Sequence, residues 1–90
     1  MKIEYDPDKS SKNVKERGLP FDMVFDLEWD RAVIIPDNRK DYGEKRLIAF
    51  VPFRGRLYVV CYTSKKDIRR IISFRKANDR EVKKIWLKNH

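Results

Sequence analysis

Two segments of the chain carry residue types that suit chemistry on phosphate esters. Residues 69–76 surround a short β-branched apolar run with four cations, and residues 37–46 place Glu44 two positions before Arg46. Side chains two apart on a strand share a face, so a strand that begins near Glu44 would hold a carboxylate beside a guanidinium. The planar fork of arginine matches phosphate oxygens. Both segments therefore favour a polyphosphate partner, above all a nucleic acid.

Cleavage of RNA by its own 2′-hydroxyl needs a base for the hydroxyl proton, an acid for the departing 5′ oxygen, and cations for the charge that grows at phosphorus. Glu44 is the candidate base. Three arginines of predicted strands are the candidate stabilisers of the charge: Arg46, Arg70 and Arg75. The acid stays open among three side chains: Tyr42, Lys65 and Lys76. The structural alternative for Glu44 and Arg46 is an exposed ion pair, worth under about 1 kcal/mol.

The formal net charge of +8 is concentrated in the second half of the chain. Residues 1–44 carry eight Lys and Arg against eleven Asp and Glu, a net of −3, whereas residues 45–90 carry fourteen against three, a net of +11. Such asymmetry is typical of a protein with one surface for nucleic acid. Solubility is the alternative explanation, and a membrane surface is disfavoured because the cations fall on predicted strands rather than along one amphipathic helix. The RNA contacts that we expect come from five side chains: Tyr42, Lys65, Lys66, Arg69 and Lys76.

Composition narrows the class of protein. Ninety residues predict a single domain, residues 1–90, with one modest core. Cys61 is the only cysteine, so no intramolecular disulfide can form, and its apolar surroundings predict a small buried side chain. The only histidine is His90, so we expect neither a metal site nor a cofactor. The sequence contains no secretory h-region and no apolar run of about twenty residues, which predicts a cytoplasmic protein without a membrane span.

The first third of the chain predicts one strand and two helices. Residues 2–5 alternate as a short strand, and Asp6 followed by Pro7 has the form of an N-cap with proline at the first helical position. We expect that helix to end at Gly18, a natural residue for a helix C-terminus. A second, short helix is expected over residues 20–27. Its core residues stand at helical spacing: Phe21, Val24 and Phe25.

The remainder predicts four strands and a last helix. The strands are expected over residues 32–35, 45–53, 56–63 and 68–75, and the last three must be antiparallel neighbours because their connections are so short. Asn78 followed by Glu81 predicts a capped helix. Its inward residues are expected to be Val82, Ile85 and Trp86. The order β-α-α-β-β-β-β-α predicts an α+β fold with the helices on one side of an antiparallel sheet of four to five strands.

Motifs along nearly the whole chain resemble those of the BrnT toxins. In chain order these motifs are Tyr5-Asp6-Pro7-Asp8-Lys9, Asn13, Gly18, Phe21, Asp37-Asn38-Arg39, Tyr42-Gly43-Glu44-x-Arg46, Thr63, Arg70-Ile71-Ile72-Ser73-x-Arg75-Lys76-Ala77 and Glu81. The two long motifs that contain Glu44 and Arg70, in this order, are the most specific part of the resemblance. Two positions depart from the pattern, because Arg17 stands where BrnT toxins often have histidine and Lys65 stands where they have arginine.

The resemblance implies a RelE-like fold and a type II toxin, an endoribonuclease that inhibits translation and growth by cutting RNA. The sequence shows no set of metal ligands, which favours metal-independent cleavage. It also implies a cognate antitoxin of the BrnA type, encoded adjacently, and a complex that represses its own promoter by binding operator DNA through the antitoxin. Carried over by position, it indicates the catalytic residues Glu44, Arg46, Arg70 and Arg75.

Two other functions stay open on the residues alone. One is a module that binds RNA or DNA without cutting it, which would show steep salt dependence and leave RNA intact. The other is an interaction subunit whose main role is to complete a repressor complex with its neighbour.

Overall fold

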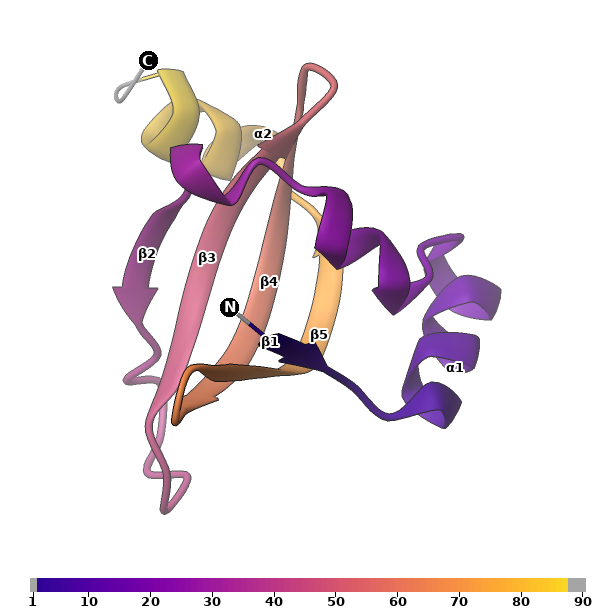
Figure 1. Ribbon diagram of the computed structural model, residues 1–90. Helices are drawn as coiled ribbons and strands as arrows, with labels where there is room; N and C mark the ends of the chain where they lie inside the picture. The colour runs from indigo at the N-terminus through magenta and orange to yellow at the C-terminus, as the bar shows by residue number, and fades with distance from the viewer. Residues whose placement is uncertain (1, 88–90) are drawn as a thin grey trace.

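The computed structural model of the chain describes residues 2–87 (Figure 1). In chain order its elements are β1 (Lys2–Glu4), α1 (Pro7–Arg17), the 3₁₀ helices η1 (Phe21–Asp26) and η2 (Trp29–Arg31), β2 (Val33–Pro36), β3 (Arg46–Phe53), β4 (Arg56–Lys65), β5 (Ile68–Lys76), α2 (Asp79–Glu81) and the π-helical turn η3 (Val82–Trp86). The five strands form one sheet in the order β1-β5-β4-β3-β2. The α+β class is confirmed, and the predicted strands are present with ends that differ by one or two residues.

The sheet is mixed, not antiparallel as the sequence predicts. Strands β2 to β5 pair antiparallel, whereas β1 pairs parallel with β5, from Lys2 opposite Ile68 to Glu4 opposite Arg70. The prediction was wrong at this edge because no hairpin joins β1 to β5. The direction of β1 is therefore not set by a tight turn, as it is for the strands that follow one another directly.

Helix α1 has the ends that its sequence predicts. The carboxylate of Asp6 accepts a hydrogen bond from the amide of Asp8 at 2.9 Å, and Pro7 opens the helix. At the other end Gly18 adopts a φ of 70°, and its N–H donates to the Val14 carbonyl. Within the helix Asn13 is buried, so α1 presents a polar anchor to the sheet.

The second N-terminal helix is η1, which has 3₁₀ rather than α geometry. A 3₁₀ helix has three residues per turn, so Phe21 and Val24 lie on one face and both are buried. Phe25, predicted to join them in the core, is instead 55% exposed. The error has a simple cause, because the spacing of four residues that places Phe25 beside Phe21 holds only in an α-helix.

Helices cover both faces of the sheet, which corrects the prediction that they lie on one side (Figure 1). On one face η1 and η2 pack over a buried cluster that includes Ala49, Val60 and Phe74. On the other face Val82, Ile85 and Trp86 pack against a smaller cluster of Phe50, Leu57 and Val59. The predicted inward residues of the last helix are thus confirmed. That helix reaches over only one end of its face, so the opposite end stays open.

The last helix begins with the predicted cap. The Asn78 side chain accepts from the Glu81 amide at 2.8 Å, and the Glu81 carboxylate accepts from the Asn78 amide at 3.0 Å.

None of the helices formed by residues 2–87 has the length and hydropathy that a transmembrane segment requires.

Candidate active site

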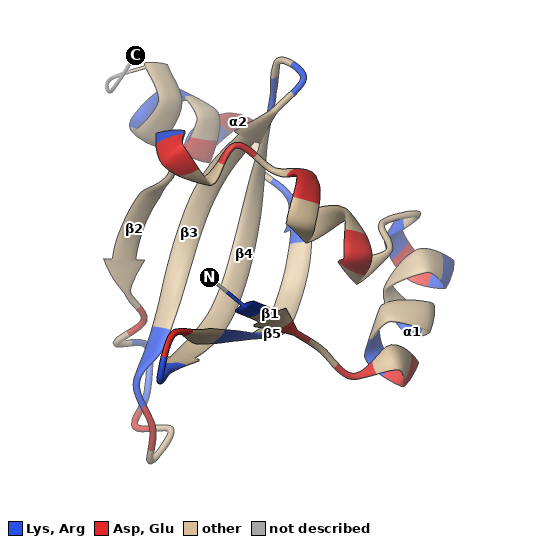
Figure 2. Cartoon of the chain, in the orientation of Figure 1, with Lys and Arg blue, Asp and Glu red and all other residues tan. Residues whose placement is uncertain are grey.

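The open end of this sheet face carries a row of polar side chains. Arg46 of β3 pairs with Thr63 of β4, and Thr63 pairs with Arg70 of β5. Glu4 of β1 continues the row beside Arg70. We call these four residues the polar row. Figure 2 shows Lys and Arg gathered at this end of the sheet, at the start of β3 and around the turn between β4 and β5.

A β-bulge in β5 decides which residues join this face. Tyr62 pairs with Ile71 and Cys61 pairs with Ser73, so Ile72 is an extra residue between them. Without the bulge, alternation would put Arg70 on one face and both Ser73 and Arg75 on the other. With it, Arg70, Ser73 and Arg75 share the open face, while Ile71 and Phe74 enter the core. The bulge therefore explains how one strand can place its arginines on the open face and its apolar residues in the core, although the two kinds do not alternate strictly in the sequence.

The spacing of the polar row suits one phosphate group. Neighbouring strands lie about 4.8 Å apart, so the backbones of Arg46 and Arg70, two strands apart, are separated by about 10 Å. Both side chains rise from rigid strands on either side of the Thr63 hydroxyl. A phosphate above Thr63 would thus be within reach of two guanidinium groups and one hydroxyl.

The guanidinium of Arg46 is oriented by stacking. Its Cζ lies 3.9 Å from the centroid of the Tyr42 ring, and Lys40 Nζ lies 5.1 Å from the same centroid. The Nε atom of Arg46 is buried and has no hydrogen-bond partner within residues 2–87. The aromatic ring, rather than a carboxylate, therefore holds this guanidinium. Tyr42, predicted as an RNA contact, is part of the site through Arg46.

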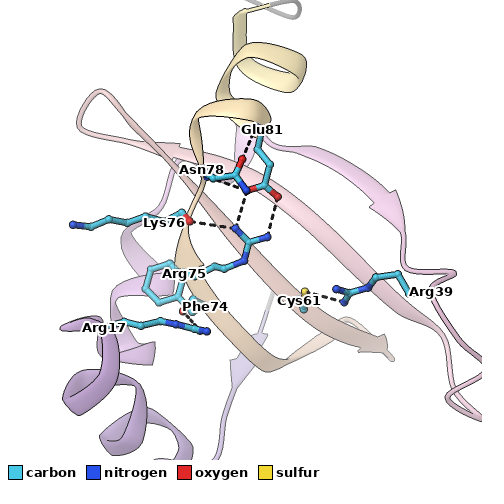
Figure 3. Close-up of polar contacts among 8 residues, drawn as sticks. All are labelled: Arg17, Arg39, Cys61, Phe74, Arg75, Lys76, Asn78 and Glu81. Atoms are coloured by element: carbon cyan, nitrogen blue, oxygen red, sulfur yellow. Dashed lines mark hydrogen bonds and ion pairs between the residues drawn. The ribbon is translucent and has the colours of Figure 1, made fainter.

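A third arginine reaches the same face from the loop after β2, and the sequence analysis missed it. Arg39 donates to both oxygens of the Asp37 carboxylate at 2.7 Å, and its Nη2 lies 3.9 Å from Cys61 Sγ (Figure 3). The Asp37 side chain is only 1% exposed, and the hydrogen bonds from Arg39 lower its pKa to about 2. The sequence does contain an acid and an arginine two residues apart after a predicted strand, which is a pattern that could form an ion pair. The neighbouring residues do not reveal that Arg39 reaches Cys61 of β4.

Cys61 of β4 lies on the open face of the sheet, opposite Ser73 of β5. It is partly exposed, although its apolar neighbours in sequence predict burial. Its strand alternates, so Val60 and Tyr62 take the core face and Cys61 takes the open face. The thiol is free.

Arg75, predicted as catalytic, is engaged by the last helix. It donates to Glu81 through Nη1 at 2.7 Å and through Nη2 at 2.9 Å, as Figure 3 shows. This pairing raises the pKa of Arg75 and lowers the pKa of Glu81, chiefly through the hydrogen bonds between them. Nη1 also lies 3.3 Å from the Lys76 carbonyl. The fork of Arg75 is therefore already occupied by protein groups.

Two of the predicted lysine contacts lie at the end of the polar row. A pocket of about 200 Å³ is lined by Glu4, Thr63, Lys65, Lys66, Ile68 and Arg70. Lys65 and Lys66 thus share a concave surface with Arg70. Lys65, which stands where BrnT toxins have arginine, keeps the positive charge at this place without the planar fork.

Three residues that the sequence predicts for the site lie away from the polar row: Glu44, Arg69 and Lys76. Glu44 lies in the exposed loop before β3, which begins only at Arg46, and no ion pair joins the two within residues 2–87. The expected strand face shared by Glu44 and Arg46 is therefore absent. Arg69 lies on the opposite face, where its Cζ is 4.4 Å from the Trp29 ring centroid and 5.2 Å from that of Tyr62. Lys76 pairs with Tyr58, a residue of that same core face.

Arg17, the other departure from the family pattern, binds the outer edge of β5. Its Nη1 lies 3.3 Å from Asn13 Oδ1. The same nitrogen lies 3.4 Å from the Phe74 carbonyl, as Figure 3 shows. Asn13 itself donates to the carbonyls of Leu19 and Phe74 at 2.8 and 2.9 Å. These contacts fasten α1 to the sheet.

In the part of the chain that the structure describes, no three His, Cys, Asp or Glu side chains are grouped as metal ligands would be. Arginines on neighbouring strands give this sheet face a positive charge that can bind a polyphosphate. The family comparison agrees, because the model of BrnT, the ribonuclease toxin of type II toxin–antitoxin systems, matches residues 5–81. The chain belongs to this family. No curated protein and no solved structure matches it significantly.

Proposed function

We propose that this chain is a metal-independent endoribonuclease that cuts RNA by acid–base chemistry and thereby inhibits translation and growth. The observation that carries the proposal is the polar row, in which Arg46 and Arg70 flank Thr63 on adjoining strands. Membership of a family of ribonuclease toxins supports RNA as the substrate.

In this proposal Arg46 and Arg70 bind the scissile phosphate from two sides. When the 2′-oxygen attacks, negative charge grows on the phosphoryl oxygens, and guanidinium groups held on strands stabilise it without further reorganisation. Removal of one such donor slows a reaction by about 100- to 1000-fold. Arg39, although paired with Asp37, is 66% exposed and adds a further cation beside the surface over which the RNA strand runs.

We further propose a RelE-like arrangement, action in the cytoplasm, and a cognate antitoxin of the BrnA type encoded adjacently. The complex would bind operator DNA through that antitoxin. Membership of a type II toxin–antitoxin family supports a protein antitoxin in general terms. Co-expression with the adjacent small reading frame should restore growth and yield a co-purifying complex.

The decisive experiment is induction of the isolated protein in bacteria, with new RNA 5′ ends mapped across the transcriptome. We expect new ends with the wild type and none with Arg70→Ala. Arg56→Ala, an exposed arginine at the far end of β4, is the matched control and should cleave like the wild type. Purified protein should also cut RNA in the presence of EDTA.

An unchanged RNA population, with folded protein in the same cells, would instead indicate a subunit that binds without cutting. Loss of cleavage in EDTA, restored by a divalent cation, would overturn metal independence alone.

A further inference from the structure

Glu4 is the carboxylate that the structure brings to the polar row. Its Oε1 lies 3.3 Å from Arg70 Nη1, although the two residues are 66 positions apart in the chain. It also lines the pocket that contains Thr63, Lys65 and Lys66. Glu44, by contrast, lies in an exposed loop. Proximity to the phosphate-binding arginine therefore favours Glu4 as the reacting carboxylate.

The three arginine–carboxylate pairs on this face differ in the number and length of the hydrogen bonds that join them. Arg39 with Asp37 and Arg75 with Glu81 each make two hydrogen bonds of 2.7–2.9 Å. Arg70 makes a single, longer contact to Glu4, and the side chains are 57% and 44% exposed. Exposed single-point ion pairs contribute little to stability. This pair can therefore open to substrate at small cost.

We propose that Glu4 is the general base of the reaction, an inference that rests on the ribonuclease function proposed above. A phosphate bound by Arg70 places the adjoining 2′-hydroxyl beside the Glu4 carboxylate. Glu4 takes the proton of that hydroxyl as the 2′-oxygen forms a bond to phosphorus. The bond from phosphorus to the 5′-oxygen breaks, and that oxygen takes a proton from the Lys65 ammonium in the same pocket. The products are a 2′,3′-cyclic phosphate and a free 5′-hydroxyl.

The test compares Glu4→Gln with Glu16→Gln, a matched loss of one exposed carboxylate on α1, and with Glu44→Gln at the base that the sequence suggested. Glutamine keeps the Oε1 acceptor for Arg70 but cannot take the proton, so Arg70 stays in place. Single-turnover cleavage is measured on a fluorescent RNA oligonucleotide that contains all four bases. Affinity is measured separately on its 2′-O-methyl analogue, which has no 2′-hydroxyl to react. Thermal unfolding checks that each variant is folded.

We expect Glu4→Gln to cleave about 100-fold or more slower than the wild type, with affinity for the analogue unchanged or tighter because a negative charge is gone. Glu16→Gln should cleave at the wild-type rate. A loss at Glu44→Gln as large as the one expected at Glu4→Gln, with Glu4→Gln unchanged, would return the role of the base to the loop. Glu4→Asp keeps a carboxylate and should retain more activity than Glu4→Gln.

The alternative outcomes separate the two proposals. A wild type that does not cut the oligonucleotide overturns the ribonuclease function, and the role of Glu4 with it. A wild type that cuts, with Glu4→Gln cutting equally fast, overturns only the role of Glu4. If Glu4→Gln loses affinity by the same factor as rate, then Glu4 positions Arg70 and is not the base.

Discussion

The guanidinium of Arg75 and the carboxylate of Glu81 face each other in parallel, with Nη1–Oε1 at 2.7 Å and Nη2–Oε2 at 2.9 Å. The same carboxylate accepts from the Asn78 amide, so one acid both caps the last helix and binds β5. Arg75 therefore connects the sheet to the helix that covers one end of its face. This geometry favours a structural role for Arg75, although its place in the sequence suggested a catalytic one.

Single and double alanine substitutions at Arg75 and Glu81 test that role. The side chains are 38% and 21% exposed, so solvent screens their charges only in part. We expect the two residues to be coupled by about 1 kcal/mol in the free energy of unfolding, measured by urea denaturation of the wild type and the three variants. Additive effects, or a fall in RNA affinity at Arg75→Ala as large as at Arg70→Ala, would return Arg75 to the phosphate-binding set.

Arg46 should depend on the shape of its guanidinium as well as on its charge. Lysine cannot stack as a plane on Tyr42 or bind phosphate through two parallel hydrogen bonds. We expect Arg46→Lys to weaken binding of a 2′-O-methyl RNA by about fivefold, equivalent to about 1 kcal/mol. Arg46→Ala should also reduce the dependence of log affinity on log salt by about one unit, because one phosphate contact is lost.

Fluorescence anisotropy over a salt series measures both quantities. Arg56→Ala is the control at the far end of the sheet and should leave the slope unchanged. Equal affinity of Arg46→Lys and the wild type would show that charge alone acts at this position.

The 3₁₀ geometry of η1 makes a sharp prediction about two neighbouring apolar residues. Val24 is fully buried, so Val24→Ala should destabilise the protein by about 2 kcal/mol through lost contacts and a cavity. Phe25 is largely exposed, so Phe25→Ala should change the free energy of unfolding by less than about 0.5 kcal/mol. Urea denaturation of both variants decides the point. A larger loss at Phe25 would indicate that the segment is an α-helix after all.

The elements that the sequence predicted well are those with local causes. Asp6, Pro7 and Gly18 specify the ends of α1 through contacts within the helix itself. Alternation and short turns likewise predict β3, β4 and β5. The parallel direction of β1 depends instead on pairing with a strand more than sixty residues away. The bulge at Ile72 and the 3₁₀ form of η1 are features of the backbone that alternation and helical spacing do not specify.

The residues of the candidate site also fall into those that local sequence patterns predict and those that only the folded structure brings together. Arg46 and Arg70 were predicted from their strands, and the sheet register places them in one row. Glu4 and Arg39 were not predicted as site residues, because Glu4 meets Arg70 through the β1–β5 pairing and Arg39 meets Cys61 across 22 positions of the chain. The sequence instead suggested Glu44, a loop residue close to Arg46 in the chain, as the base, and that assignment stays a prediction.

The buried Asp37 carboxylate should make the protein sensitive to acid. Hydrogen bonds from Arg39 lower the pKa of Asp37 to about 2 in the folded protein, whereas an aspartate in an unfolded chain titrates near 3.9. Between these pH values the unfolded chain binds more protons than the folded protein does. The contribution of Asp37 to stability is therefore complete above about pH 4 and is lost as the pH falls toward about 2.

Glu81 adds to this trend in the same direction, because its pKa is also lowered in the folded protein. The part that belongs to Asp37 is isolated by comparing the urea midpoints of the wild type and Asp37→Asn at several pH values. The variant should have the lower midpoint at neutral pH, since Arg39 loses its partner, and the gap should close between about pH 4 and pH 2. Asp22→Asn, at an exposed position of η1, controls for the loss of one negative charge. A gap that stays constant down to pH 2 would mean that the Asp37–Arg39 pair contributes to stability through packing rather than through the charge of the carboxylate.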